Sequence, residues 1–359
     1  MGRPDSDKLF PTMVIGSLPR PRWVQDVIQD RTLGLIGIEE ADRLLDSAVV
    51  SAIRLQERAG LDYVSDGEWR RENYVRVFAD KGGGFTRNRV QRGRLTLLAY
   101  VSDKIESRGT IVCPEAEFLR QNTDRKIVVA LPSPCTIGDL MWHPVHSASA
   151  YPTRKSFVKA CVPILHDEVK ALHELGVDAV QLDEPLVPRL ANPQVYGFEG
   201  LSELEEAVEL SVETINQVVD GLDDVFLSVH LCHGYGEESV ITDGTTGLIM
   251  NAARRYQVDR LAMEFNSSSA KKLQSLKDFP KDKLLGLGVM QPKAAEIDVP
   301  DTVVQRVRVA MEFVEKERLI LNPDCGFATT VTTPGNLDRA YLKLSSLCTG
   351  AQMLRNDYV

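Results

Sequence analysis

The run Ala179-Val180-Gln181-Leu182-Asp183-Glu184-Pro185 is mostly apolar at its start and ends in two carboxylates and a proline. An amphipathic segment precedes it at 156–175, and another follows it at 201–219. A buried strand between two helices is the repeating unit of parallel α/β folds. The run therefore predicts a parallel strand whose carboxyl end carries polar groups.

The same alternation recurs along the whole chain. Apolar runs rich in β-branched residues predict eight strands, at 12–16, 61–65, 126–130, 179–183, 225–229, 260–265, 284–289 and 319–322. Two more amphipathic segments, 302–316 and 337–347, have helical periodicity. Eight strand and helix units indicate an α/β fold of the (βα)8 TIM-barrel type. A doubly wound open sheet is the alternative.

The chain is longer than a barrel requires. A TIM barrel takes about 250 residues, whereas this chain has 359. We expect the surplus in an N-terminal helical extension (1–59), with a helix at 38–58, and in an excursion after strand two (80–124). The excursion has alternating residues and predicts a β-hairpin over the barrel mouth. Because no repeat or linker marks a boundary, we expect one catalytic domain over 1–359.

The composition excludes several classes of protein. With 42 basic and 51 acidic residues the net charge is −9, so nucleic acid and anionic membranes are poor partners. No stretch reaches the roughly 18 apolar residues of a spanning helix. The N-terminus lacks the apolar run of a secretion signal, and six cysteines are too few for a disulfide scaffold of this length. We therefore expect free thiols and a cytoplasmic location.

Metal-binding residue types lie at the ends of three of the expected strands. His230 and Cys232 are two apart, so both side chains can face the same side of one strand. Glu264 lies at the end of the strand expected at 260–265 and Cys325 follows the last strand, and these four form a ligand set that suits zinc. Because the ligands come from three strands, the pattern is typical of a substrate-binding metal site rather than a structural one. The alternative is that the cysteines only pack; we expect His233 to lie on the surface or to support a ligand.

These strand ends resemble the catalytic barrel of the cobalamin-independent methionine synthase family. The resemblance covers nearly the whole chain. Its motifs are Ile15-Gly16-Ser17, Asp66-Gly67-Glu68-Trp69-Arg70, Gln181 to Pro185, His230-Leu231-Cys232, Met263-Glu264 and Asn322-Pro323-Asp324-Cys325-Gly326. The resemblance implies zinc on His230, Cys232, Glu264 and Cys325. It also implies an amino-acid thiol held by the backbone near Ile15 and Ser17 and by the carboxylates of Glu68 and Asp183.

The resemblance leaves the methyl donor open. Full-length enzymes of the family have a second, N-terminal barrel that helps to hold methyl-tetrahydrofolate, and 359 residues leave no room for it. Alignment brings Lys293 to the place of a histidine thought to protonate the departing pterin. The pterin-contacting segment is matched only loosely, by 132–137 and Trp142. Some single-barrel relatives take methyl from a corrinoid protein, which makes such a protein a candidate partner.

The sequence thus predicts a zinc-dependent S-methyltransferase. The expected acceptor is homocysteine, the product methionine, and the donor either methyl-tetrahydrofolate or a methylcorrinoid. Glu68, Asp183 and Lys293 are the expected catalytic residues. Alkyl transfer to another thiol such as coenzyme M is the alternative activity, because Arg20, Arg70 and Arg71 could attract a sulfonate. A non-catalytic zinc- or thiol-binding barrel is the alternative class.

Overall fold

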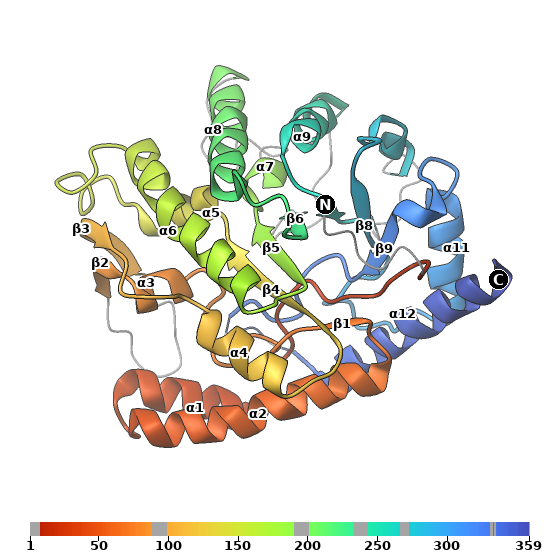
Figure 1. The fold of residues 1–359 in the computed structure, drawn as a ribbon, viewed down its shortest axis with the longest axis horizontal. Helices are drawn as coiled ribbons and strands as arrows, with labels where there is room; N and C mark the ends of the chain where they lie inside the picture. Colours follow the sequence, from red (N-terminus) through yellow and green to blue (C-terminus); the bar gives the residue numbers. More distant parts are fainter. Residues whose placement is uncertain are drawn as a thin grey trace.

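A curled parallel sheet lies at the centre of the molecule (Figure 1). The computed structural model describes residues 8–87, 99–189, 201–232, 243–265, 273–330, 333 and 335–358. The sheet has the order β1-β4-β5-β6-β7-β8-β9. Its strands are β1 (Tyr63–Val64), β4 (Lys126–Pro132), β5 (Ala179–Asp183), β6 (Leu227–Leu231), β7 (Arg260–Met263), β8 (Leu284–Gly288) and β9 (Leu319–Asn322).

The N-terminal segment closes this sheet into a barrel. Thr12 forms a parallel bridge with Leu321 of β9, and Met13 forms one with Tyr63 of β1. The Met13 N–H donates to the Leu321 carbonyl at 3.0 Å. With this eighth segment the predicted TIM barrel is confirmed, and the open-sheet alternative is wrong because both edges of the sheet are bridged.

Several strands differ from their predicted bounds. β4 continues two residues further, and β7 and β8 end two residues and one residue earlier. β1 is shorter than 61–65 because the Gln56 side chain binds both the N–H and the carbonyl of Ser65, at 2.9 and 2.7 Å, in place of a neighbouring strand. β6 begins two residues later than predicted and extends to Leu231. His230 therefore belongs to the strand itself rather than to the loop after it.

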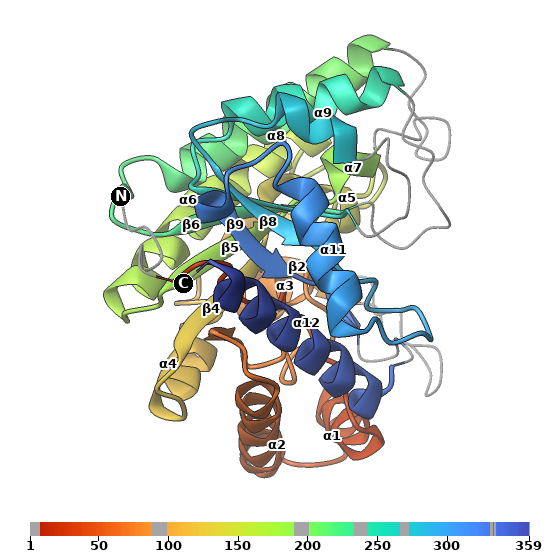
Figure 2. The ribbon, with the colours of Figure 1, turned by 90° about the vertical axis from the view of Figure 1, so that its right-hand side faces the viewer.

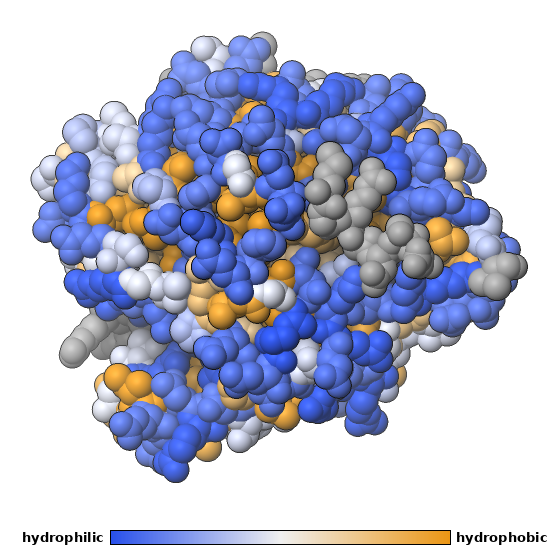
Figure 3. Space-filling model, in the orientation of Figure 1, coloured by the Kyte–Doolittle hydropathy of each residue, from blue (hydrophilic) through white to orange (hydrophobic). Residues whose placement is uncertain are grey.

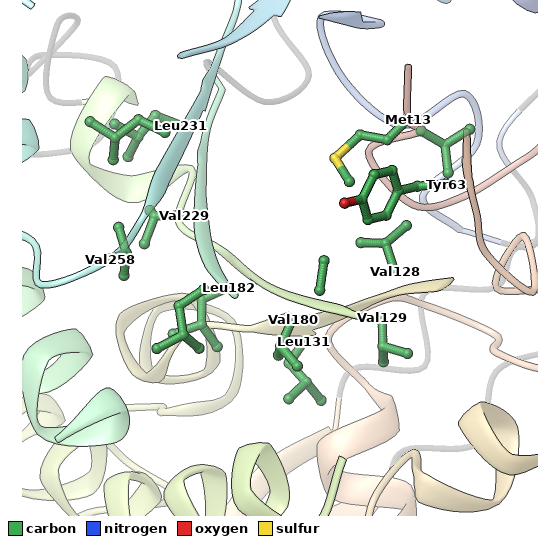
Figure 4. Close-up of a cluster of buried hydrophobic side chains, with 14 of the residues drawn as sticks. Met13, Tyr63, Val128, Val129, Leu131, Val180, Leu182, Val229, Leu231 and Val258 are labelled. Atoms are coloured by element: carbon green, nitrogen blue, oxygen red, sulfur yellow. The ribbon is translucent and has the colours of Figure 1, made fainter. Parts of the chain in front are cut away.

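Side chains alternate between the barrel interior and the helices. Val128 points towards Met13 and Tyr63, whereas Val129 points to the opposite side of β4 (Figure 4). The register pairs Val129 with Val180 and Ala130 with Gln181. Val180 thus faces the helices, while Gln181 and, two residues on, Asp183 face the interior. This alternation carries polar side chains of β5 towards the barrel mouth.

Helices surround the strands (Figures 1 and 2). Their bounds are α1 (Arg22–Leu33), α2 (Ile38–Ala59), α3 (Val77–Lys81), α4 (Cys113–Gln121), α5 (Pro134–Met141), α6 (Arg154–Glu174), α7 (Leu186–Arg189), α8 (Leu201–Val219), α9 (Asp243–Arg255), α11 (Pro300–Ala310) and α12 (Leu337–Asp357), with short 3-10 turns at Ser275–Asp278 and Lys316–Arg318. The helices predicted from periodicity are present, but α11 ends at Ala310 rather than at the predicted 316, and α12 continues ten residues beyond its predicted end at 347. No helix within the described ranges has the length and apolar character needed to cross a membrane.

The two predicted additions to the barrel are also confirmed. α1 and α2 pack against each other as a helical extension, and β2 (Gly83–Arg87) pairs antiparallel with β3 (Ala99–Glu106) as a hairpin. The side chains of Leu33, Leu35 and Ile38, where α1 leads into α2, are exposed. Figure 3 shows a corresponding apolar patch at the lower left of a largely hydrophilic face.

Candidate active site

A pocket opens at the carboxyl ends of the parallel strands, where TIM-barrel enzymes place their catalytic groups. It gathers residues from the first segment, the loop after β1, and the ends of β5, β6 and β9. The lining residues are Ile15, Gly16, Ser17, Glu68, Tyr74, Asp183, Pro185, His230, Cys232, Cys325, Gly326 and Thr329. Seven of them, namely Ile15, Ser17, Glu68, Asp183, His230, Cys232 and Cys325, are residues that the sequence predicts for the site.

Three of these side chains could hold a metal ion. A ring nitrogen of His230 and the Sγ atoms of Cys232 and Cys325 all lie within 4.8 Å of one another, and all three residues are buried. His230 Nδ1 lies 3.3 Å from the Ala262 carbonyl, and Nε2 is buried without a hydrogen-bond partner. A buried nitrogen without a partner is costly unless something binds it. The donor set and this orphaned atom fit a zinc ion.

The lowered pKa of Cys325 favours metal binding, whereas the raised pKa of His230 opposes it. A hydrogen bond with Cys232 and the neighbouring His230 hold the pKa of the Cys325 thiol well below its usual range, although burial opposes them. Burial lowers the pKa of His230, but the Cys325 thiolate and the charges of Asp183 and Glu264 raise it by more. A metal ion binds a thiolate and a neutral imidazole. Binding here would therefore use the Cys325 thiolate and would displace a proton from His230.

Glu264 lies near this cluster but outside it. It follows β7 and is half-buried, and its charge affects the pKa values of His230 and Cys325. Its carboxylate is not among the ligand atoms that lie within 4.8 Å of one another in the described chain. Its part as a fourth ligand stays a prediction. His233 lies outside the described residues.

Two buried carboxylates line the same pocket. Burial, together with the charge of Asp183, raises the pKa of Glu68 to about 7, although Arg71 opposes the rise. Burial raises the pKa of Asp183 to about 6, against the effect of His230. Glu68 Oε2 is buried without a hydrogen-bond partner. The pair thus offers a cationic ligand an acceptor that the protein leaves open.

The adjacent residues Asp183 and Glu184, at the end of β5, point to opposite sides of the strand and have different contacts. Asp183 points into the pocket, and its Oδ1 accepts from Gln181 Nε2 at 2.9 Å. Glu184 accepts hydrogen bonds from the Ser133 and Ser211 hydroxyls at 2.8 and 3.0 Å, both on the helix side of the strand. Asp183 is thus available to a ligand, whereas Glu184 holds helices α5 and α8 against the barrel.

Gln181 also fixes the first segment. Its Nε2 donates to the Ile15 carbonyl at 2.6 Å as well as to Asp183. Ser17 is held from the other side, because its carbonyl accepts from Phe327 N and its hydroxyl from Ala328 N, at 2.8 and 3.3 Å. The backbone from Ile15 to Ser17 is therefore anchored to β5 and to the loop that carries Cys325.

Arginines beside the pocket are bonded to the protein. Arg71 donates to Glu115 and to the Ala130 carbonyl, both at 2.8 Å, and lies 3.6 Å from Glu68 Oε1. Arg70 pairs with Asp46 and lies over the Phe118 ring. Arg71 also lines a second cleft, beside α2 and α4, whose arginines and carboxylates form the pairs Arg31–Asp42, Arg70–Asp46 and Arg71–Glu115. These arginines donate their hydrogen bonds to carboxylates and carbonyls of the protein itself.

Two predicted residues are placed elsewhere. Trp142 is half-buried in the loop after α5, and its indole N–H donates to the Tyr151 carbonyl at 3.0 Å. Lys293 is exposed on the loop after β8. Neither residue is among the described residues that line the pocket. Their parts in binding or protonating a donor stay predictions.

Some residues of the site were not expected from the sequence. Tyr74 and Thr329 line the pocket, and no motif singles them out. The role of Gln181 had a signal, because it is a polar side chain in an apolar strand, two residues before Asp183 and on the same face.

A parallel barrel that brings two thiols, an imidazole and two carboxylates to its carboxyl-end mouth has the architecture of a TIM-barrel enzyme. The chain belongs to the cobalamin-independent synthase family, whose catalytic-domain model matches residues 10–337.

Individual relatives agree with this assignment. The chain is 31% identical to a methionine synthase of Pyrococcus abyssi over 355 residues, which cover 97% of this chain and 94% of the relative. It is 28% identical to a methionine synthase of Saccharolobus solfataricus, covering 97% and 96%. Among solved structures, a B12-independent methionine synthase from Shewanella sp. W3-18-1 has the same fold, with a TM-score of 0.78, 24% identity and coverage of 98% and 99%.

Proposed function

We propose that the protein is a zinc-dependent S-methyltransferase that transfers a methyl group to homocysteine and produces methionine. This proposal rests on one observation: the same pocket contains a group of metal-binding side chains and a pair of carboxylates. His230, Cys232 and Cys325 offer soft metal ligands, and Glu68 and Asp183 offer carboxylates to an ammonium group. An acceptor that is both a thiol and an amine fits this combination. The curated relatives named methionine synthase support it.

His230, Cys232 and Cys325 would hold the zinc, with Glu264 as the proposed fourth ligand. Bound zinc would supply the nucleophile by deprotonating the acceptor thiol, whose free pKa is about 8.5. The two ring nitrogens of His230 have different roles. Its Nδ1 is turned towards the Ala262 carbonyl, which fixes the ring and leaves Nε2 for the metal.

The two carboxylates would bind and orient the amino group. Glu68 Oε2 is open to a donor, and Asp183 is kept in place by the hydrogen bond from Gln181. Arg71 lies 3.6 Å from Glu68 and lowers its pKa against the effect of burial, so it favours the ionised carboxylate that an ammonium requires. The anchored backbone at Ile15 and Ser17 would line the same acceptor pocket.

A methylcorrinoid is the donor we propose, and a corrinoid protein is its proposed carrier. Departure of a tertiary amine from methyl-tetrahydrofolate leaves an anion that must be protonated, whereas a corrinoid leaves as a stable reduced metal. Lys293, the candidate acid, is exposed on its loop. We therefore expect slow or absent turnover with free methyl-tetrahydrofolate.

The experiment is a methyl-transfer assay with zinc-loaded protein and homocysteine. Methylcobalamin and methyl-tetrahydrofolate are supplied separately, and the product is read by mass. We expect methionine from methylcobalamin, little from the folate, and none with Cys325→Ser. Coenzyme M replaces homocysteine in a parallel reaction, and faster methylation of that thiol would overturn the proposed acceptor. Zinc retention without transfer from any donor would indicate a binding protein.

A further inference from the structure

Glu68 has an unusual backbone conformation. Its φ is +57°, and Gly67 before it has a φ of +67°. The left-handed region suits glycine but is unfavourable for a residue with a long side chain. Such a conformation persists when surrounding contacts hold it, and it is found at functional sites. The position of the Glu68 carboxylate thus depends on the contacts that hold this turn.

Side chains of Ser65 and Asp66 accept from the N–H groups of Gly67 and Glu68 within this turn, and Arg20 contacts it from a different part of the chain. Arg20 is 4% exposed, and its guanidinium donates to the Glu68 carbonyl at 2.6 Å. The same guanidinium donates to the carbonyls of Ala328 and Thr330, at 2.8 and 3.3 Å. One side chain therefore joins the loop after the first segment, the turn at Glu68 and the loop that follows Cys325.

We infer that Arg20 is a positioning residue for the acceptor pocket: it holds the left-handed turn at Glu68 so that the carboxylate stays in place for the acceptor's amino group. This inference rests on the proposed function. The fit around Glu68 is tight, because a Cβ on Gly16 would lie 2.7 Å from Glu68 Oε1. A small shift of the turn would therefore move the carboxylate away from its place beside the first segment.

The contacts distinguish Arg20 from a ligand-binding arginine. Its guanidinium serves three backbone carbonyls, and its side chain does not line the pocket defined by the described residues. Metal binding should survive its loss. The loop after Cys325 keeps two other anchors, from Phe327 N and Ala328 N to Ser17.

The test compares Arg20→Met and Arg20→Lys with Arg22→Met as the matched control. Arg22 is an exposed arginine two residues away that pairs with Asp26 on its own helix. Homocysteine affinity, kinetics, zinc content and thermal unfolding are measured for each. We expect Arg20→Met to raise Kd and KM for homocysteine about ten- to a hundredfold, with a smaller change in kcat and full zinc. Arg20→Lys should recover part of the affinity, and Arg22→Met should match wild type.

A double-mutant cycle tests whether Arg20 acts through Glu68. If it does, adding Arg20→Met to Glu68→Gln should weaken binding no further than Glu68→Gln alone. Effects that multiply would overturn the inference. So would a loss of zinc in proportion to the loss of homocysteine, because Arg20 would then support the whole mouth of the barrel.

Hydrogen exchange tests the inference without any ligand. In Arg20→Met or, if that variant does not fold, Arg20→Lys, we expect faster exchange at residues 66–71 and unchanged exchange in α4. Unchanged exchange at 66–71 would overturn the inference. Failure of wild-type protein to bind homocysteine would instead overturn the proposed function, so the two failures are distinguishable.

Discussion

Asp183 on β5 and His230 on β6 are direct partners in the parallel register of the barrel. Neighbouring strands lie about 4.8 Å apart, so an acidic and an imidazole side chain enter the pocket side by side. Burial has the largest effect on the pKa of each group, and each charge then favours the ionised form of the other. This pairing places the proposed ammonium site next to the proposed metal site, as an acceptor with both groups requires.

Replacement of a thiolate should remove the metal and leave the fold. We expect zinc bound stoichiometrically by wild type to be lost in Cys325→Ser, because the cluster of His230, Cys232 and Cys325 lies at the barrel mouth rather than in its core. Metal analysis and circular dichroism measure the two effects. Cys348→Ser, which changes a cysteine packed against Gly60, is the control and should keep its zinc. A zinc-free wild type that takes up none on addition would contradict the account.

Removal of one carboxylate charge should weaken acceptor binding selectively. A hydrogen bond to a charged group contributes about 1.5 to 3 kcal/mol, so Asp183→Asn should reduce homocysteine affinity about ten- to a hundredfold. Zinc content should not change. Calorimetric titration gives the affinity, with the exposed Asp220→Asn as control. Equal affinities in Asp183→Asn and wild type would show that the amino group binds elsewhere.

A single methyl group at Gly16 should displace Glu68. The added Cβ would lie 2.7 Å from Glu68 Oε1, too close for contact without movement of the carboxylate. We expect Gly16→Ala to raise the KM for homocysteine with zinc retained. Gly37→Ala is a matched control, because nothing lies within 4 Å of its added Cβ. Normal kinetics in Gly16→Ala would mean that the position of Glu68 is not critical.

The buried carboxylates should make stability depend on pH. Burial raises the pKa of Glu68 from an ordinary 4.5 to about 7, so the folded chain binds this proton more tightly than the unfolded chain. Stability from this group is therefore greatest at low pH and falls as pH rises from 4.5 to 7, by up to about 3 kcal/mol. The proposed binding of homocysteine to the ionised carboxylate should strengthen over the same range.

The variant Glu68→Gln tests this sign. At about pH 8 it should unfold at a higher denaturant concentration than wild type, and the difference should shrink at about pH 5.5. The exposed Glu117→Gln should follow wild type at both values. A Glu68→Gln variant that is less stable at the higher pH would show that the Arg71 interaction outweighs the cost of burial.

Much of this arrangement could be predicted because barrel strands are short, apolar and β-branched. β5 and β9 match their predicted bounds, and the polar residues after such runs converge in a parallel barrel whatever their separation in sequence. That rule was enough to predict that His230 and Cys325 lie close together. The ends of other strands depended on side chains far from the pattern, such as Gln56 at Ser65.

The rest depends on geometry that residue types do not encode. Asp66-Gly67 indicates a turn, but neither the left-handed conformation of Glu68 itself nor the reach of Arg20 across three loops has a local sequence signal. Trp142 follows α5 closely, but its indole binds within its own loop. Sequence distance from a helix end does not fix the direction in which a loop turns, so the predicted contact of Trp142 with a donor could not be derived from its position.

X-ray absorption at the zinc edge gives the number of sulfur ligands at the proposed metal site. We expect two sulfur ligands, from Cys232 and Cys325, in the zinc-loaded protein. Addition of homocysteine should raise this number to three, because in the proposed function the acceptor thiol would bind the metal. Addition of methionine, whose sulfur already carries the methyl group, is the control and should not reproduce the change. An unchanged sulfur number at saturating homocysteine would show that the acceptor thiol does not bind the metal.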